Sequence, residues 1–255
     1  MIYFIVAKHN EDVLNNYLIP SVQKIQSELY LIEGSDNIYQ KYNTGIQWLK
    51  DKGLKDNDIV CFIHEDVKIL DPEFQRKIEY LFTNKPEVGA CGVIGTRELL
   101  ENGSWWINDQ KKLLGHIIQE NNDQTYHLIK GGIGYSDEMV VVDGLMIAIR
   151  GSLINKGLKF DESYESFHLY DVTICSQVLE MGYRVACVDI LLQHKSPGMG
   201  FLAKDWLDMR DKFVEKIKIK GYNFPLTFDS FKDANQKMLI TSATEADIVF
   251  TENLS

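Results

Sequence analysis

The stretch DIVCFIHEDV, residues 58–67, decides the fold of this chain. Ile59 to Ile63 are apolar without alternation and mostly β-branched or aromatic, which predicts a central strand covered on both faces. The run ends on His64, Glu65 and Asp66, three side chains able to bind a metal ion or a sugar hydroxyl. Open α/β sheets bind ligands at the carboxyl ends of their strands. Since adjacent carboxylates are costly to bury alone, this strand end predicts a ligand site; the alternative is a solvated strand end.

Composition limits the partners of the protein. The chain has 255 residues, 45% of them hydrophobic, which suits one large or two small globular domains. Its formal net charge is -10 at pH 7 and no long block of like charge stands out, so we expect no nucleic-acid partner. A phosphate ligand would therefore need a cation close to it.

Apolar runs and cysteines bear on the compartment. No apolar run approaches the length of a membrane span, and the first strand has no cationic segment before it. We therefore expect a cytoplasmic protein without a transmembrane segment, for which peripheral contact with a membrane stays open. The widely spaced cysteines form no Cys-x-x-Cys pair and are expected to be buried and reduced: Cys61, Cys91, Cys175 and Cys187.

The first part of the chain alternates between strand and helix patterns. Apolar runs predict strands at residues 2–7, 28–33, 59–63 and 88–94. Between them, periodic apolar residues predict helices, of which the second begins at Ser35 or Asp36 and the third at Asp71-Pro72. This alternation predicts an α/β fold, with a mainly parallel central sheet flanked by helices.

The pattern loosens from Thr96 to Asp137, where long loops and short edge strands are expected. Trp105 and Trp106 lie in this stretch and provide either a stacking platform for a sugar ring or one side chain packed under a loop. Strand character resumes over residues 139–149 but is interrupted by Asp143-Gly144. A carboxylate inside an apolar strand is paired or functional, and a neighbouring glycine lets a ligand or backbone approach.

The last patterned region contains further polar candidates. Asp171 is expected in the first turn of a helix, where favourable interaction with the helix dipole would by itself explain an acid. A strand over residues 183–192 follows, and His194 comes just after it. An amphipathic helix over residues 206–217 precedes a polar, weakly patterned end.

Taken in order, these motifs resemble the family-2-like glycosyltransferases of the GT-A fold. The stretch VAKHNE at residues 6–11 is similar to that family's V-P-x-Y-N-E opening, and Glu33-Gly34-Ser35 to its D-G-S turn. Residues 42–46 (YNTGI) resemble its R-N-x-G-I helix, and residues 160–162 its F-D-E motif. His64 stands for the first aspartate of D-x-D, and Tyr170 for the glutamate that precedes the aspartate of E-D.

The resemblance implies a domain organisation. It predicts one GT-A-like domain over residues 1–217, with a nucleotide-binding half at 1–95 and an acceptor half at 96–217 that contains a smaller antiparallel portion. Residues 218–255 would form a C-terminal extension.

The resemblance also implies an activity: inverting transfer of a sugar from a nucleotide-diphosphate donor, foremost a UDP-sugar, to a hydroxyl of a carbohydrate acceptor such as a polysaccharide precursor. Mn²⁺ or Mg²⁺ would neutralise the leaving diphosphate. Asp66 and His194 are the expected ligands, and their mixed oxygen and imidazole set favours Mn²⁺. Asp171 would be the general base. Donor contacts are expected at Ala7, His9, Glu33, Asn43, His64 and Glu65, and acceptor contacts at Asp143, Gly144, Trp105 and Trp106.

Two alternatives remain at this point. The departures at His64 and Tyr170 are compatible with a catalytically degenerate GT-A protein that only binds a nucleotide or a carbohydrate. The second alternative is a nucleotidyltransferase. Such an enzyme needs a glycine-rich, basic loop after its first strand to hold a triphosphate, and the absence of glycine from residues 8–11 (KHNE) argues against it.

Overall fold

The computed structural model describes residues 1–35, 37–107, 109–196 and 204–234. Its central strand β3 (Ile59–Ile63) is buried along its whole length, as the apolar run predicts. On one side β3 pairs in parallel with β1 (Ile2–Ala7), and on the other it pairs antiparallel with β12 (Met146–Arg150). The strand therefore lies inside the main sheet, and its carboxyl end delivers His64 to Asp66 to one sheet edge.

The main sheet has seven strands in the order β10-β13-β5-β12-β3-β1-β2. Five of them run in one direction, whereas β12 and β10 run against their neighbours. The expected mainly parallel sheet is thus confirmed. The remaining bounds are β2 (Ser27–Ile32), β5 (Val88–Gly92), β13 (Arg184–Cys187) and β10 (Ser136–Met139).

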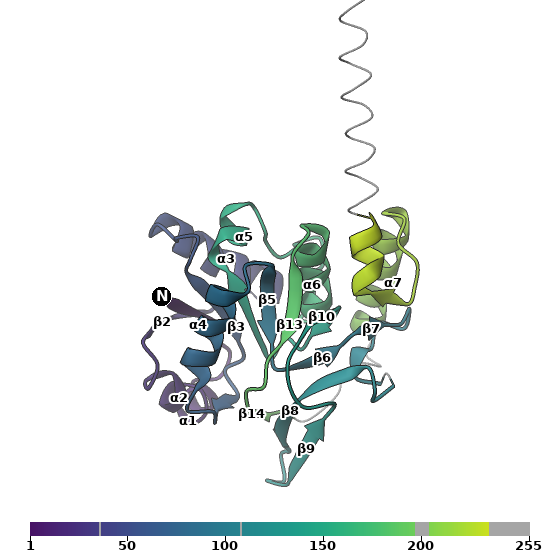
Figure 1. Cartoon of the computed structure of the whole chain (residues 1–255). Helices are drawn as coiled ribbons and strands as arrows, with labels where there is room; N and C mark the ends of the chain where they lie inside the picture. The colour runs from purple at the N-terminus through teal and green to yellow at the C-terminus, as the bar shows by residue number, and fades with distance from the viewer. Residues whose placement is uncertain (36, 108, 197–203, 235–255) are drawn as a thin grey trace, which may run out of the picture.

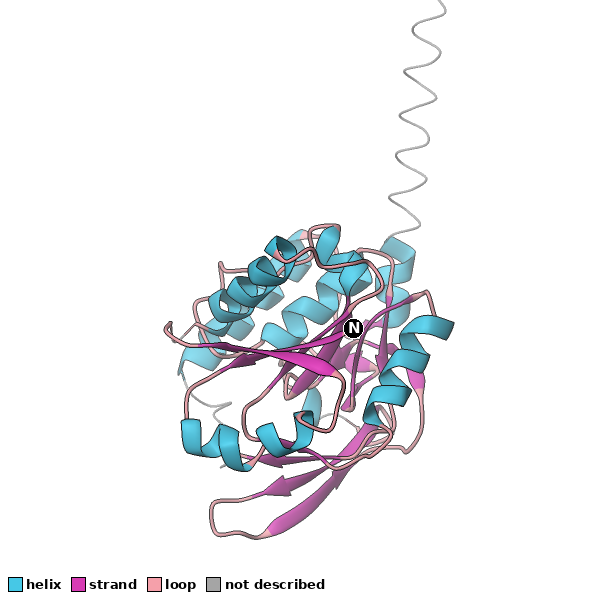
Figure 2. Ribbon diagram, turned by 90° about the vertical axis from the view of Figure 1, so that its left-hand side faces the viewer, coloured by secondary structure: helices cyan, strands magenta, loops and turns pink. Residues whose placement is uncertain are grey.

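Helices cover both faces of this sheet (Figures 1 and 2). Side chains of neighbouring strand residues point to opposite faces. Phe4 stacks on Phe74 of α4 (Phe74–Asn84), whereas Ile5 packs under Gly45 of α3 (Ile38–Asp51), where an added Cβ would lie 2.6 Å from the Ile5 side chain. Helices α3 and α4 therefore lie on opposite faces. The other helices are α1 (Glu11–Asn16), α2 (Ile19–Val22), α5 (Gly151–Asn155), α6 (Tyr170–Glu180) and α7 (Lys204–Ile219).

A second sheet lies across the end of the first and is mostly antiparallel; it draws strands from both halves of the chain. Its order is β11-β6-β8-β14-β4, with β9 paired to β8 as a hairpin that projects from the body (Figure 1). The strands are β4 (Val67–Ile69), β6 (Ile94–Thr96), β8 (Leu113–Glu120), β9 (Tyr126–Lys130), β11 (Val141–Val142) and β14 (Leu192–Lys195).

Several expected boundaries were wrong. Helix α4 begins at Phe74, because Asp71 instead accepts a hydrogen bond from the Glu73 backbone N–H at 2.8 Å and closes a turn. The single strand expected over residues 183–192 is two strands in two sheets, β13 and β14, and His194 lies within the second. The run over residues 139–149 likewise divides into the end of β10, β11 and β12.

The chain after β14 returns to the body through α7, which packs beside α6 (Figure 1). A short strand β15 (Leu226–Thr227) pairs with β7 (Glu98–Leu99), and a 3₁₀ turn spans Trp105–Ile107. Among the described residues no helix is long and apolar enough to cross a bilayer.

Candidate functional site

Three side chains from two distant segments meet at the carboxyl end of β3. His64 and Asp66 follow that strand directly, and β14 brings His194 beside them by pairing with β4, so that His194 lies opposite Val67. The Lys195 backbone N–H donates to the Asp66 carbonyl at 2.9 Å and holds this register. The Asp66 Oδ1 atom lies 3.5 Å from His194 Nε2 and 3.8 Å from His64 Nδ1.

This cluster, His64, Asp66 and His194, fits a divalent ion. One potential ligand atom from each residue lies within 4.8 Å of the others. Ligands held about 2.1 Å from one ion are about 3.0 to 3.5 Å apart, so small adjustments suffice. The Asp66 Oδ1 atom is buried, and no donor in the described part of the chain reaches it with hydrogen-bonding geometry. Two imidazoles and one carboxylate suit Mn²⁺ better than Mg²⁺, because Mn²⁺ is a transition-metal ion and accepts imidazole nitrogen more readily.

Burial and mutual charge shift the pKa values of the three cluster residues in different directions. Burial tends to raise the pKa of Asp66, but the two imidazoles outweigh it and hold that pKa below its usual value. Burial lowers the pKa of His64, so its ring is neutral at neutral pH and carries a lone pair for a metal. Burial also tends to lower the pKa of His194, but the Asp66 carboxylate 3.5 Å away outweighs burial and raises that pKa overall.

A cavity of about 400 Å³ opens beside the cluster. It lies where β1 and β3 end, and most of the residues predicted to contact a donor contribute to it. Its lining consists of Ala7, His9, Lys41, His64, Glu65, Asp66, Phe167, His194 and Ser196.

Two of the predicted donor residues have contacts that tie the fold together. The Glu65 carboxylate accepts the backbone N–H groups of His9 at 2.7 Å and Asn10 at 2.9 Å, and so fixes the loop after β1 to the end of β3. Glu33 is largely exposed, pairs with Lys8 at 2.7 Å and does not line the cavity.

Lys41 is a cavity residue that the motif comparison missed. Its side chain is 7% exposed, and its Nζ donates to the Lys8 carbonyl at 3.1 Å. Within the described residues no carboxylate pairs with it. The sequence did contain a signal, because Lys41 comes three residues after Ile38 on the apolar stripe of α3, where a charged residue is out of place.

Phe167 was also missed. Its side chain is half exposed at the cavity, with its ring centroid 5.9 Å from that of His64. It lies in a loop without a periodic pattern, so the sequence offered no signal for it. The loop ends at Leu169, a non-glycine residue with φ of 61°, immediately before α6.

Asp171 lies in the first turn of α6, as expected, and its environment is unusual. Burial and the nearby Asp143 carboxylate raise the pKa of Asp171 to about 7, while hydrogen bonds from the Val172 N–H and the Trp105 side chain oppose that rise. Asp171 does not line the cavity, but its neighbour Tyr170 contacts His64. A carboxyl group with a pKa near neutrality is suited to general acid or base chemistry.

The predicted acceptor residues gather around Asp171. Trp105 is buried and bonded to it, and Asp143 accepts the Leu145 backbone N–H at 2.8 Å. Gly144 lies against the Tyr170 hydroxyl, where an added Cβ would collide with the ring. Trp106 packs edge-on against Trp105 and Trp206, with ring centroids 5.7 and 6.2 Å apart.

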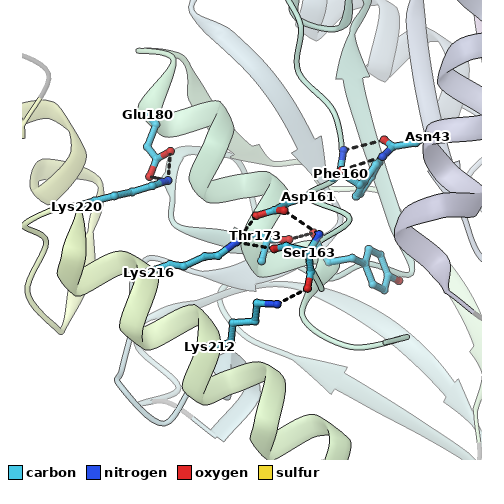
Figure 3. Close-up of polar contacts among 10 residues, drawn as sticks. Asn43, Phe160, Asp161, Ser163, Thr173, Glu180, Lys212, Lys216 and Lys220 are labelled. Carbon is cyan, nitrogen blue, oxygen red and sulfur yellow. Dashed lines mark hydrogen bonds and ion pairs between the residues drawn. The ribbon is translucent and has the colours of Figure 1, made fainter. Parts of the chain in front are cut away.

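Asn43 lies outside the cavity and holds a loop. Its amide N–H donates to the Phe160 carbonyl at 2.8 Å, while its oxygen accepts the Phe160 N–H at 2.9 Å (Figure 3). The amide also donates to the Glu162 carboxylate at 2.7 Å. These contacts anchor the segment between Phe160 and Asp171, so the position of Asn43 gives no support to its expected donor contact.

Comparison with known proteins now defines the class. A family model described as "Glycosyltransferase like family" matches residues 3–216, which is most of the chain. The chain therefore belongs to this glycosyltransferase family and is a glycosyltransferase of the GT-A fold. A comparison with curated proteins finds no match.

A solved structure shows the same fold at low identity. The crystal structure of GalNAc-T7 with UDP, GalNAc and Mn²⁺ is similar with a TM-score of 0.51 and 8% identity, over 92% of this chain and 54% of that one. This chain thus spans about half of the length of that structure. The crystal structure of A197 from STIV has a TM-score of 0.48 and 13% identity, over 76% of this chain and 84% of that one.

We predict that Asn43→Ala lowers stability without weakening ligand binding. The substitution leaves the Phe160 N–H and carbonyl without partners, which costs about 1 to 3 kcal/mol. Chemical denaturation measures the loss, and Gln47→Ala, one turn further along α3, is the control and should cost much less. A variant of normal stability that loses nucleotide affinity would contradict the structural role.

Proposed function

We propose that this protein is an inverting, metal-dependent glycosyltransferase that moves a sugar from a UDP-type donor to a hydroxyl of a carbohydrate acceptor. The observation that supports it most is the cluster of His64, Asp66 and His194 beside a cavity of about 400 Å³, in a chain of this family. We also propose residues 1–217 as the catalytic unit, and the cytoplasm as its compartment, since the free cysteines suit reducing conditions.

A bound cation and one lysine would supply the positive charge that an anionic donor needs at the cavity. The protein carries a formal net charge of -10, which by itself repels a nucleoside diphosphate. A divalent ion held by the His64, Asp66 and His194 side chains would neutralise the departing diphosphate. Lys41 adds a cation inside the same cavity. UDP and Mn²⁺, both present in the GalNAc-T7 structure, are the first ligands to test.

The surroundings of the cavity suit the rest of a nucleotide. Phe167 offers a half-exposed aromatic face at the rim, on which a base can stack. Ala7 and His9, at the end of β1, line the same cavity and provide backbone and imidazole groups for a ribose or base.

Asp171 is the general base of the proposal. Its carboxylate removes the proton from the acceptor hydroxyl while the oxygen attacks the anomeric carbon, and the nucleoside diphosphate departs from the opposite face. The Trp105 N–H holds one side of this carboxylate in place. Burial and the Asp143 carboxylate keep the pKa of Asp171 high, which makes Asp171 a stronger base once it is ionised.

The first prediction from this proposed function concerns donor binding. UDP together with Mn²⁺ should raise the melting temperature, because a ligand at 100 times its Kd stabilises a protein by about 2.7 kcal/mol. UDP without metal should stabilise less, and Asp66→Asn should remove the difference. A protein indifferent to every nucleoside diphosphate would favour a purely carbohydrate-binding role.

The second concerns Lys41. Lys41→Gln should weaken UDP binding by about tenfold or more and leave uridine binding unchanged, because a hydrogen bond to a charged group contributes about 1.5 to 3 kcal/mol. Lys50→Gln, an exposed lysine on the same helix, is the matched control. Titration calorimetry distinguishes the outcomes, and equal losses for UDP and uridine would argue against a phosphate contact.

The third concerns the base. Asp171→Asn should lower kcat by about 10²- to 10⁴-fold with donor affinity nearly intact. In the wild type, kcat should rise with pH through an apparent pKa of about 7, because only the ionised carboxylate accepts a proton. A normal kcat in the variant would exclude this role.

Stability provides a check that is independent of turnover. The raised pKa means that the folded state holds the Asp171 proton more tightly than the unfolded chain. Relative to the asparagine variant, the wild type should therefore lose stability as pH rises from about 4 to about 7. Parallel stability curves over this window would show that Asp171 has an ordinary pKa.

A further inference from the structure

The two ring nitrogens of His64 face different partners. Its Nδ1 atom faces Asp66 Oδ1 at 3.8 Å, within the cluster suited to a metal ion. Its Nε2 atom is hydrogen-bonded to the hydroxyl of Tyr170, the first residue of α6. The Tyr170 side chain is 5% exposed, and Gly144 leaves the room that its hydroxyl occupies.

The two ring nitrogens must play different roles in a metal complex. A neutral imidazole carries its proton on one nitrogen and a lone pair on the other. If Nδ1 is the ligand, the proton must lie on Nε2, where it needs an acceptor. The Tyr170 oxygen is placed to accept it, whereas a phenylalanine at this position would leave the Nε2–H without that partner.

We propose that Tyr170 is a positioning residue that keeps the proton of His64 on Nε2 and thereby presents Nδ1 to the metal ion. This inference rests on the metal site of the proposed function and deepens it. Two of the positions at which the sequence departs from the family motifs, His64 and Tyr170, are thus in contact with each other. Tyr170 also joins the metal ligand to the base, because Asp171 is the next residue on α6.

The ring and the hydroxyl of Tyr170 can be tested separately. The ring packs against Tyr42 and Phe160, with centroids 5.6 and 6.4 Å apart, and Tyr170→Phe retains that packing. Tyr39→Phe is the matched control, because Tyr39 belongs to the same aromatic cluster but its hydroxyl donates to the His168 carbonyl at 2.8 Å.

The first measurement is the Mn²⁺ affinity of the full chain, monitored by electron paramagnetic resonance in the absence of substrate. Tyr170→Phe should weaken binding by about 10- to 100-fold, the usual effect of losing the partner of a metal-bound histidine. Tyr39→Phe should bind like the wild type. In a His64→Ala background the Tyr170→Phe effect should vanish, which a general structural weakening would not do.

The second measurement is the position of the ring proton, from proton–nitrogen correlation spectra of isotopically labelled histidine with Zn²⁺ as a diamagnetic probe. The wild type should show His64 protonated on Nε2. Protonation on Nδ1, or unchanged Mn²⁺ affinity in Tyr170→Phe, would overturn the inference and leave the proposed function standing. A wild type that binds neither Mn²⁺ nor UDP would overturn both.

Discussion

The site depends on one buried carboxylate held between two imidazoles. Asp66 is mostly removed from water, a position that costs free energy for an ionised acid unless partners compensate it. His194 and His64 provide that compensation, and the pairing of β14 with β4 brings His194 into place. The second sheet is therefore part of the candidate site, since without it the end of β3 would lack His194, one of the three proposed metal ligands.

Much of the fold was predictable because it follows from local patterns. The unbroken apolar run at Ile59–Ile63 indicated a central strand, and the chemistry of the three residues after it indicated a ligand site at the sheet edge. The break at Asp143-Gly144 was also predictable, because an acid and a glycine interrupt an apolar run there. The division of residues 183–192 was not, because one short apolar run does not show that the chain leaves one sheet and enters another.

The site was predictable only in part, because motif resemblance assigns residue types and not the directions of side chains. Asn43 matches a family motif, yet it faces the Phe160 backbone instead of the cavity. Lys41, two residues earlier on α3, has no motif but lines the cavity. Phe167 enters through a loop whose course depends on tertiary contacts. The metal and donor roles of the cluster, and the base role of Asp171, stay predictions.

The segment between Phe160 and Asp171 is fastened from two sides (Figure 3). Asn43 of α3 is hydrogen-bonded to the Phe160 backbone at its beginning. Lys216 of α7 donates hydrogen bonds to the Asp161 and Ser163 side chains, each at 2.6 Å. The segment is bonded to α3 and α7 near its beginning and continues into α6 at its end. It therefore has little freedom to move as a hinged flap. The proposed base would accordingly keep a fixed position, and the acceptor sugar would have to orient its own hydroxyl toward it.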